Sequence, residues 1–321
     1  MKRVFVTGCA GYIGSTASRL FLESGYEVIC VDKLIYTGRP ILTLMQFENF
    51  HFMRADIYDV EEYKDFIDSE TAVVHLAAIV GEPASRKHPD ETKKTNFEAT
   101  KRLIDMAVRK GVKHFVFVST CSNYGKVVQN EYATEAHPLN PLSLYAETKV
   151  AIEEYLKNEV KESLNWTILR FATVYGISPR MRFDLTVNDF TMHAMVDKKL
   201  LIYLPYSNRP YVHVVDVSRA LKSVLENSDK ALHQVFNVGD TRENYRKIDI
   251  VNLIRKETGD FEVEFVEKGS DPRDYKVSFE KIRKVLGFEI TKRVPDGIRE
   301  VAFAVRNGII TDFENPEYYN A

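Results

Sequence analysis

The chain has 321 residues, of which 45% are hydrophobic and 28% charged. This composition is typical of folded globular proteins and excludes a disordered, collagen-like or low-complexity chain. The length indicates one large domain or two closely packed ones. Lys and Arg number 44 against 46 Asp and Glu, so the formal net charge is −2. There is no basic excess to attract nucleic acid or an anionic membrane, and neither is expected as a partner.

The cysteines and the N-terminus bear on cellular location. Cys9, Cys30 and Cys121 are too few and too scattered for a disulfide framework or a four-thiolate zinc site, which fits a reducing compartment. No metal site is expected. Glycines interrupt the apolar run after Thr7, unlike a signal peptide, and no run of about 18 apolar residues could cross a membrane. We therefore expect a soluble cytoplasmic protein.

Short β-rich runs alternate with helical stretches through the first half of the chain. They cover residues 4–7, 28–32, 50–54, 71–75, 114–119 and 166–171. Several, such as AVVHL and HFVFV, are apolar at successive positions, as expected of strands covered on both faces. The pattern predicts an α/β fold with a doubly wound parallel sheet of the Rossmann type.

From about residue 175, prolines and arginines interrupt shorter segments, and strand character returns at residues 236–238. We interpret this change as a second, smaller lobe. The predicted division assigns residues 1–172 to a Rossmann domain, to which 212–240 return. Residues 173–211 and 241–321 form the smaller C-terminal lobe.

Three glycines follow the first predicted strand at the start of an amphipathic helix. Gly8, Gly11 and Gly14 allow a tight turn whose backbone N–H groups, with the helix N-terminus, suit a pyrophosphate. The G-x-x-G-x-x-G spacing differs from the common dinucleotide fingerprint and is weak by itself. Asp32 ends the second strand close to the roughly 20-residue spacing at which an acid bonds the adenosine ribose. An acid there favours NAD over NADP.

Asp56, after the third strand, could bond the adenine amino group, although an acidic loop residue is equally ordinary there. Further along, Tyr145 and Lys149 stand four residues apart on one face of a predicted helix. A nearby ammonium favours the phenolate form of a tyrosine, so the pair suits general-base catalysis at a hydroxyl group. A Ser/Thr-rich strand end, VSTCSNYG, precedes them.

These motifs stand in an order that resembles one known family. They are TGCAGYIG, VD at 31–32, HLAA at 75–78, TNFEAT at 95–100, YAETK at 145–149, LRFATVYG at 169–176 and RPYVHVVDV at 209–217. Over nearly its whole length the chain resembles the extended short-chain dehydrogenase/reductases, in their NAD-dependent nucleotide-sugar epimerase and dehydratase branch. The resemblance implies a Rossmann domain that binds NAD and a C-terminal lobe that binds a nucleotide-diphosphate sugar.

The resemblance also implies roles for particular residues. Tyr145 exchanges the proton of a sugar hydroxyl, Lys149 bonds the nicotinamide ribose, and Thr120 positions the same hydroxyl, although a strand-end hydrogen bond competes as the role of Thr120. The cofactor contacts are expected at Gly8, Gly11, Tyr12, Ile13, Gly14, Asp32, Lys33, Asp56, Ile57, Leu76, Ala77, Ala78, Asn96, Ser119, Tyr145 and Lys149. The substrate contacts are expected at Thr120, Ser122, Asn188, Arg209 and Arg273. Arg180 and Arg182 also suit a diphosphate, but for these two the alternative of an ordinary surface position stays open.

The residues after Thr120 favour one activity over its sisters. The 4,6-dehydratases of the family carry an Asp-Glu pair there, and the decarboxylases carry a Glu at the second position, whereas this chain has Cys121 and Ser122. Neither supplies the acid/base pair that removal of water requires. We therefore expect a 4-epimerase that acts through a 4-keto intermediate. The alternative is a nucleotide-sugar dehydrogenase or 4-keto reductase. Separately, Thr173 stands where the family has Asn, which puts the family's sugar contact at that position in doubt. A homodimer formed through helices near 89–109 and 144–161 follows from the resemblance alone.

Overall fold

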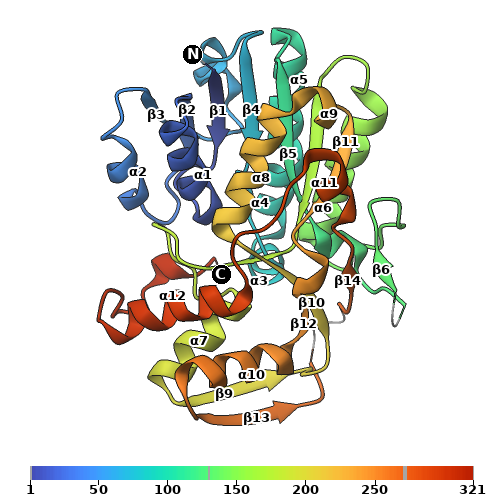
Figure 1. Ribbon diagram of the computed structural model, residues 1–321. Helices are drawn as coiled ribbons and strands as arrows, with labels where there is room; N and C mark the ends of the chain where they lie inside the picture. The colour runs from blue at the N-terminus through green and yellow to red at the C-terminus, as the bar shows by residue number, and fades with distance from the viewer. Residues whose placement is uncertain (1, 129–130, 270–272, 321) are drawn as a thin grey trace.

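A seven-stranded parallel sheet forms the centre of the larger lobe (Figure 1). The computed structural model describes residues 2–128, 131–269 and 273–320. The strands lie in the order β11-β7-β5-β4-β1-β2-β3. Their bounds are β1 Arg3–Thr7, β2 Glu27–Asp32, β3 Phe50–Arg54, β4 Thr71–His75, β5 His114–Thr120, β7 Trp166–Phe171 and β11 Gln234–Val238. This order confirms the predicted doubly wound parallel sheet.

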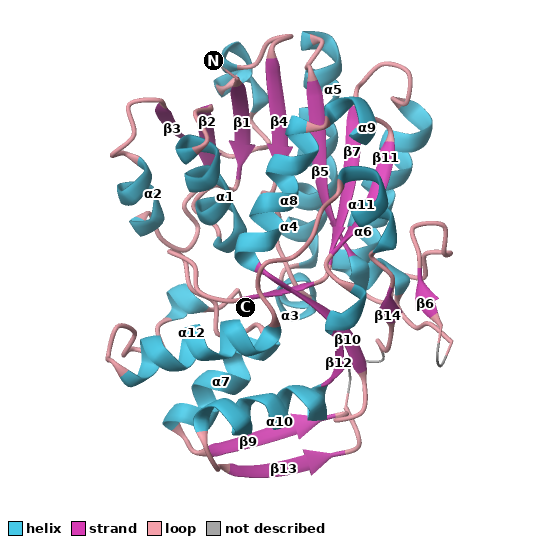
Figure 2. Ribbon diagram, in the orientation of Figure 1, coloured by secondary structure: helices cyan, strands magenta, loops and turns pink. Residues whose placement is uncertain are grey.

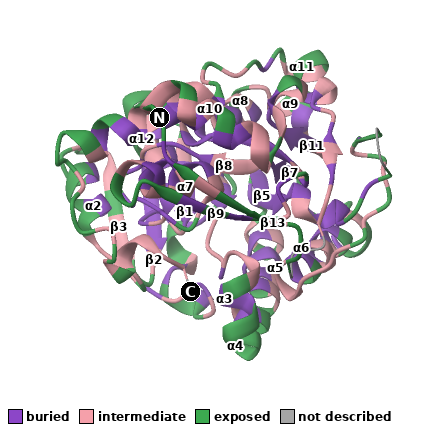
Figure 3. Cartoon of the chain, turned by 90° about the horizontal axis from the view of Figure 1, so that it is seen from below, coloured by how far each residue is buried: buried purple, intermediate pink, exposed green. Residues whose placement is uncertain are grey.

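Alternate residues of each strand enter two different hydrophobic clusters. On β1, Val4 and Val6 pack in one cluster and Phe5 in the other; on β5, Val116 and Phe117 divide in the same way. Successive side chains of a strand point to opposite faces of a sheet, so the uninterrupted apolar runs reflect burial on both sides. Figure 3 shows this buried centre in purple, with exposed residues concentrated on outer elements such as α4 (Pro89–Lys93).

Helices cover both faces of the sheet. On one face α1 (Tyr12–Glu23) packs against α8 (Val214–Glu226), and their apolar residues join the cluster of Val4 and Val6. On the other face lie α5 (Thr100–Lys110) and α6 (Leu144–Glu154). The shorter helices of this lobe are α2 Arg39–Leu44, α3 Glu82–Lys87, α4, α9 Ser228–Ala231 and α11 Glu280–Leu286. Single π-helical stretches, Lys94–Ala99 and Tyr155–Glu159, lead into α5 and continue α6.

The smaller lobe lies beyond the carboxyl ends of the strands. Figure 2 shows the arrowheads of β1 and β4 pointing towards it. It contains α7 Thr186–Val196, α10 Lys247–Thr258, α12 Val294–Arg306, and the strands β8 Thr173–Tyr175, β9 Lys199–Tyr203, β10 Asn208–His213, β12 Asn244–Arg246 and β13 Glu262–Val266. Another strand pair, β6 Tyr132–Ala133 and β14 Lys276–Val277, lies beside the larger lobe. Within the described ranges, no helix combines the length and apolarity needed to cross a membrane.

The strand order places a topological switch point at β1. This strand pairs with β2 on one side and β4 on the other, while the chain connections run away in opposite directions. The crevice outside the carboxyl ends at such a point is where α/β sheets bind ligands. Most of the predicted cofactor and substrate residues lie at this edge of the sheet.

Candidate active site

A cavity of about 610 Å³ lies at the carboxyl edge of the sheet, between the two lobes. Its volume is in the range of small-molecule and cofactor sites. The predicted cofactor and substrate residues in its wall are Gly8, Gly11, Tyr12, Ile13, Gly14, Asp32, Lys33, Asp56, Ile57, Leu76, Ala77, Ala78, Ser119, Thr120, Ser122, Tyr145, Lys149, Arg209 and Arg273. Predicted residues that lie far apart in the sequence, from the glycine turn at Gly8 to Arg273, therefore meet at one cavity.

The glycine turn forms one end of this cavity. A Cβ atom added to Gly14 would lie 2.0 Å from the Gly8 carbonyl oxygen, so only glycine fits where α1 begins. Gly8 has φ +75°, and a Cβ there would meet the backbone of Ala77 at 2.7 Å. The close backbone packing places the N-terminus of α1 at the cavity wall, which suits the pyrophosphate of a dinucleotide.

Acidic groups lie at the same end. Asp32 accepts hydrogen bonds from the backbone N–H groups of Ala10 and Leu34, at 2.9 and 2.8 Å, which fixes its carboxylate at the cavity wall. Burial raises the pKa of Asp32, and these two hydrogen bonds oppose the increase. Lys33 forms an ion pair with Asp56 at 2.9 Å. This pair offsets the charge of Lys33, whereas Arg180, buried in the cavity wall, acts on Asp32 and lowers its pKa. The carboxylate of Asp32 is suited to ribose hydroxyls rather than to a 2′-phosphate.

The structure corrects the expectation drawn from the cysteine count. Cys9, in the glycine turn, and Cys30, on β2, form a disulfide with their Cα atoms 6.0 Å apart, and both residues are buried. The scattered positions did not predict this bond, because it depends on the pairing of β1 with β2: the Gly8 N–H donates to the Val31 carbonyl and places the turn beside β2. Cys121 is a free, buried thiol.

Helix α6 carries the predicted catalytic pair. The Ser143 hydroxyl accepts a hydrogen bond from the Ala146 N–H at 3.3 Å and caps the helix N-terminus. Lys149 lies one turn beyond Tyr145, with its Nζ 6.0 Å from the Tyr145 ring centre. The same Nζ donates to the Val118 carbonyl at 2.8 Å. Burial lowers the pKa of Lys149 to about 7, and the negative charge of Glu153 opposes this decrease.

The protonation of Tyr145 depends mainly on burial and on nearby cations. The pKa of its phenol is raised to about 12, because burial outweighs the charge of Arg182, a hydrogen bond with Thr120 and the charge of Arg273, which lower it. Arg182 forms a two-point ion pair with Asp184 at 2.8 and 2.7 Å and lines the cavity. Arg182 is therefore the main protein cation acting on the phenol, a role that sequence reasoning did not assign.

The two residues directly after Thr120, Cys121 and Ser122, carry no carboxylate. Thr120 donates to the Ser122 hydroxyl at 3.1 Å. Cys121 is buried, and its Sγ donates to the Arg170 carbonyl at 3.3 Å, so it does not line the cavity. Burial raises the pKa of the Cys121 thiol well above its ordinary value. The thiol is therefore neutral and is not an acid/base group for a bound substrate.

Cations line the far end of the cavity. Arg209 lies over the Tyr275 ring, with its guanidinium carbon 5.2 Å from the ring centre, and Arg273 approaches Glu82 at 3.9 Å. Guanidinium groups pair well with phosphate oxygens, so this end suits a diphosphate. Glu82 follows the HLAA motif, where the family resemblance places the sugar pocket, whereas Tyr275 lacked a sequence motif that would have assigned it to this place.

Two predicted contacts do not reach the cavity wall. Asn96 exchanges hydrogen bonds with the backbone of Ile79 and so holds the loop after β4. Asn188, on α7, accepts from the Gly176 N–H and donates to the Tyr12 hydroxyl. Both amides are buried and bonded to protein groups, so they hold residues of the cavity wall in place and do not line the cavity themselves.

The fold and the arrangement of the site define a class of protein. The chain belongs to the NAD-dependent epimerase/dehydratase family, whose model matches residues 4–239. This result confirms the resemblance to the extended short-chain dehydrogenase/reductases, and the NAD dependence of the family agrees with the predicted cofactor.

Particular relatives include more than one activity. A dTDP-glucose 4,6-dehydratase of Streptomyces griseus is 31% identical over 307 residues, covering 92% of this chain and 91% of that protein. The UDP-glucose 4-epimerase structure from Thermotoga maritima has a TM-score of 0.85 and 28% identity and covers 96% of this chain and 100% of that one. The UDP-glucuronic acid 4-epimerase of Bacillus cereus, solved with UDP-glucuronic acid and NAD, has a TM-score of 0.82 and 26% identity, covering 95% and 99%.

Proposed function

We propose that this chain is an NAD-dependent nucleotide-sugar 4-epimerase. The observation that carries the proposal is the composition of the sugar end of the cavity. It holds a tyrosine, a threonine and a lysine suited to move one hydroxyl proton, while the positions after Thr120 offer Cys121 and Ser122. Oxidation and reduction at a single carbon need only one proton-transfer group. The 4-epimerases among the structural relatives support the same activity.

The glycine turn and Asp32 would hold NAD at one end of the cavity, with Tyr145 and Lys149 at its nicotinamide. Bound NAD supplies a hydride acceptor that can also return the hydride. Tyr145 takes the proton of the sugar 4-hydroxyl and later gives it back, and Thr120 holds that hydroxyl in place. Arg182 favours the phenolate form of Tyr145, since a positive charge stabilises it. Arg209 and Arg273 bind the diphosphate. The nucleotide therefore stays bound while the keto-sugar rotates in the cavity and presents its other face.

The dehydratase relatives raise a different possibility that the site does not favour. Removal of water from carbons 5 and 6 needs an acid and a base beside the sugar. The neutral Cys121 thiol points to a backbone carbonyl, and the Ser122 hydroxyl is 3.4 Å from the Tyr275 hydroxyl. Glu82 does line the cavity, but it forms ion pairs with Arg86 and Arg273. It is better suited to bind than to transfer a proton.

The test compares cofactor content and turnover. Freshly purified protein is denatured and the released NAD is measured; intact protein is then incubated with UDP-, GDP- and dTDP-sugars without added cofactor. Retained NAD and formation of the C4 stereoisomer are expected; Tyr145→Phe should retain NAD and form the stereoisomer about 10²–10⁴-fold more slowly. Cofactor-free protein that turns over only with added NAD(H), accompanied by a matching absorbance change, would establish a dehydrogenase or reductase. A 4-keto-6-deoxy product would establish a dehydratase.

We propose further that the larger lobe binds NAD and the smaller lobe binds the nucleotide sugar. The division follows the predicted one, 1–172 and 212–240 against 173–211 and 241–321, except that residues 275–288 pack with the core of the larger lobe. A homodimer through the helices at 89–109 and 144–161, and a cytoplasmic location, also stay predictions. Light scattering on a purified sample would test the dimer. A monomer at micromolar concentration would contradict it.

A further inference from the structure

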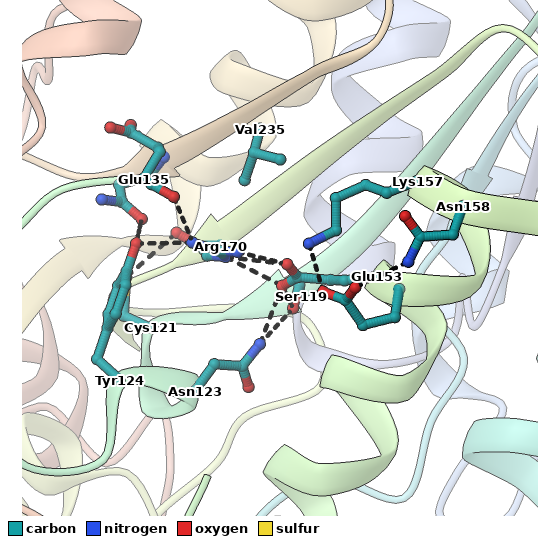
Figure 4. A network of polar contacts seen from close by, with 12 residues as sticks. Ser119, Cys121, Asn123, Tyr124, Glu135, Glu153, Lys157, Asn158, Arg170 and Val235 are labelled. Carbon is teal, nitrogen blue, oxygen red and sulfur yellow. Dashed lines mark hydrogen bonds and ion pairs between the residues drawn. The ribbon is translucent and has the colours of Figure 1, made fainter. Parts of the chain in front are cut away.

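A buried polar network joins α6, the helix that carries Tyr145 and Lys149, to β5 and β7 of the sheet (Figure 4). Its centre is Glu153 on α6, which is 0% exposed. One carboxylate oxygen accepts from the Ser119 hydroxyl at 2.6 Å and from the Asn123 amide at 2.9 Å. Arg170 on β7 donates to both carboxylate oxygens, with a shortest distance of 2.6 Å. Every partner of this carboxylate is thus fixed by a different element.

Arg170 is itself held from its other side. Its Nη1 donates to the Tyr124 hydroxyl at 3.0 Å and to the Glu135 carbonyl at 3.2 Å. The Glu153 carboxylate raises the pKa of Arg170 although burial opposes it, so the guanidinium stays charged. A buried ion pair costs desolvation energy and is weak evidence for a purely stabilising role. The position of the Glu153–Arg170 pair next to the active site therefore indicates a role there.

The spacing along α6 connects the network to the active site. Tyr145, Lys149 and Glu153 follow one another at intervals of four residues and therefore share one face of the helix. Each meets the end of β5 in turn: Tyr145 bonds Thr120, Lys149 bonds the Val118 carbonyl, and Glu153 bonds Ser119. These contacts lock α6 to the part of β5 that lines the cavity.

The charges around Lys149 indicate what Glu153 does. On its own helix Lys149 is flanked by Tyr145 and Glu153; from β4, the buried His75 faces it, and from β5, the Phe117 ring lies 4.8 Å from Nζ. Burial lowers the pKa of His75 to about 3 and raises that of Tyr145 to about 12, so both are neutral at pH 7. Arg182 and Arg273, across the cavity, act on Tyr145. Within the described chain, Glu153 is the anion whose charge offsets the burial of Lys149.

We propose that Glu153 is a positioning residue of the active site: fixed by Arg170, its carboxylate sets a negative charge one helical turn from Lys149 and, through Ser119, holds the end of β5 that carries Thr120. The proposal rests on the proposed catalytic role of Tyr145 and Lys149. It assigns the Glu153–Arg170 pair a function in setting the charge next to the phenol, in addition to any part in folding.

The test follows the titration of Lys149 directly. Protein labelled with ¹³C at the lysine Cε atoms is titrated by NMR, and the Lys149 signal is assigned with Lys149→Met. Glu153→Gln keeps the shape of the side chain and removes its charge. We expect its Lys149 midpoint to move to lower pH by about one unit, which reduces the charged fraction at pH 7 about five-fold. Glu154→Gln is the matched control, because Glu154 is the next residue, is exposed and pairs with Lys157. It should leave the titration unchanged.

Glu153→Gln leaves Arg170 as a buried charge without its carboxylate, and this can prevent folding. The double variant Glu153→Gln/Arg170→Met removes both charges and is expected to shift Lys149 in the same direction. A folded variant that titrates as the wild type does would overturn the proposal. Failure of both variants to fold would overturn it as well, since the pair would then act on the fold. The titration requires no sugar substrate, so its result is independent of whether the chain proves to be an epimerase.

Discussion

Tyr145 is the residue whose chemistry the surroundings alter most directly. Its phenol is buried and would by itself be a poor base at neutral pH, because burial raises its pKa to about 12. Positive charge from Arg182 and Arg273 and the hydrogen bond to Thr120 offset only part of this increase. These three groups come from separate segments of the chain. The protein groups alone therefore leave the phenol protonated at pH 7, although they make its ionisation less costly than burial by itself would.

The first prediction concerns this phenol. Tyr145→Phe removes only the hydroxyl group, so we expect turnover of the nucleotide sugar to fall about 10²–10⁴-fold, the usual contribution of general acid-base catalysis. The melting temperature and the amount of NAD released on denaturation should stay close to those of the wild type. Tyr206→Phe, at an exposed tyrosine, serves as the control. A Tyr145→Phe enzyme with wild-type turnover would exclude Tyr145 as the proton-transfer group.

At the scale of the elements, side chains that cross between strands and helices hold the catalytic edge of the sheet. His75, at the end of β4, bonds the Thr7 hydroxyl of β1 at 2.7 Å and the Thr100 hydroxyl at the start of α5 at 2.9 Å. The imidazole is fully buried, and burial lowers its pKa to about 3. The packing of these three elements thus depends on a histidine that stays neutral.

We predict that this histidine makes the fold sensitive to acid. The pKa of His75 is about 3 in the folded protein and near 6.5 in the unfolded chain, so the unfolded chain binds more protons below pH 6.5. Its stabilisation is present above that pH and is lost as the pH falls towards 3. Between pH 7 and 5 the free energy of unfolding should decrease by about 2 kcal/mol from this group. The free energy of unfolding is measured with urea at pH 7 and at pH 5. Its decrease between the two pH values should be smaller in His75→Asn than in His51→Asn, the control at an exposed site. Equal decreases would contradict the assignment.

The disulfide links a second pair of elements. Cys9 precedes α1 and Cys30 lies on β2, with a sequence separation of 21 residues. Closing a loop of this length is worth about 3 kcal/mol in the chain-entropy model. We expect that dithiothreitol, or the pair of substitutions Cys9→Ala/Cys30→Ala, lowers the midpoint of unfolding by guanidinium chloride by the amount that a loss of about 3 kcal/mol produces. Dithiothreitol should not affect the midpoint of the double variant. An unchanged wild-type midpoint in reductant would show that the disulfide does not stabilise the protein.

At the scale of the whole molecule, the C-terminal segment joins the two lobes across the cavity. The rings of Phe313 and Tyr318 lie 5.6 and 5.4 Å from that of Phe183. Tyr319 and Asn320 line the cavity, and the Asn320 N–H donates to the Asp184 carboxylate. The segment therefore covers apolar residues of the smaller lobe and closes one side of the proposed substrate site.

Removal of residues 312–321 should accordingly affect both stability and cofactor retention. Exposure of Phe183 and its neighbours is expected to cost about 3 kcal/mol, and NAD should be released more readily during gel filtration. Glu317→Gln is the control, because it removes only the exposed ion pair with Arg39, which is expected to contribute less than about 1 kcal/mol. A truncated protein with wild-type stability and NAD content would contradict this role.

The sequence by itself determined the parts that depend on local pattern. The apolar strands, the glycine turn at Gly8 and the four-residue interval between Tyr145 and Lys149 are properties of neighbouring residues, and periodicity and backbone sterics make them readable. The tertiary structure alone decided which distant residues meet. It joined Cys9 to Cys30, turned Asn188 away from the cavity towards Tyr12, and placed Arg182 beside the phenol. It also paired Glu153 with Arg170 on a different element. These contacts depend on strand order and helix packing, which bring together groups that no local spacing connects.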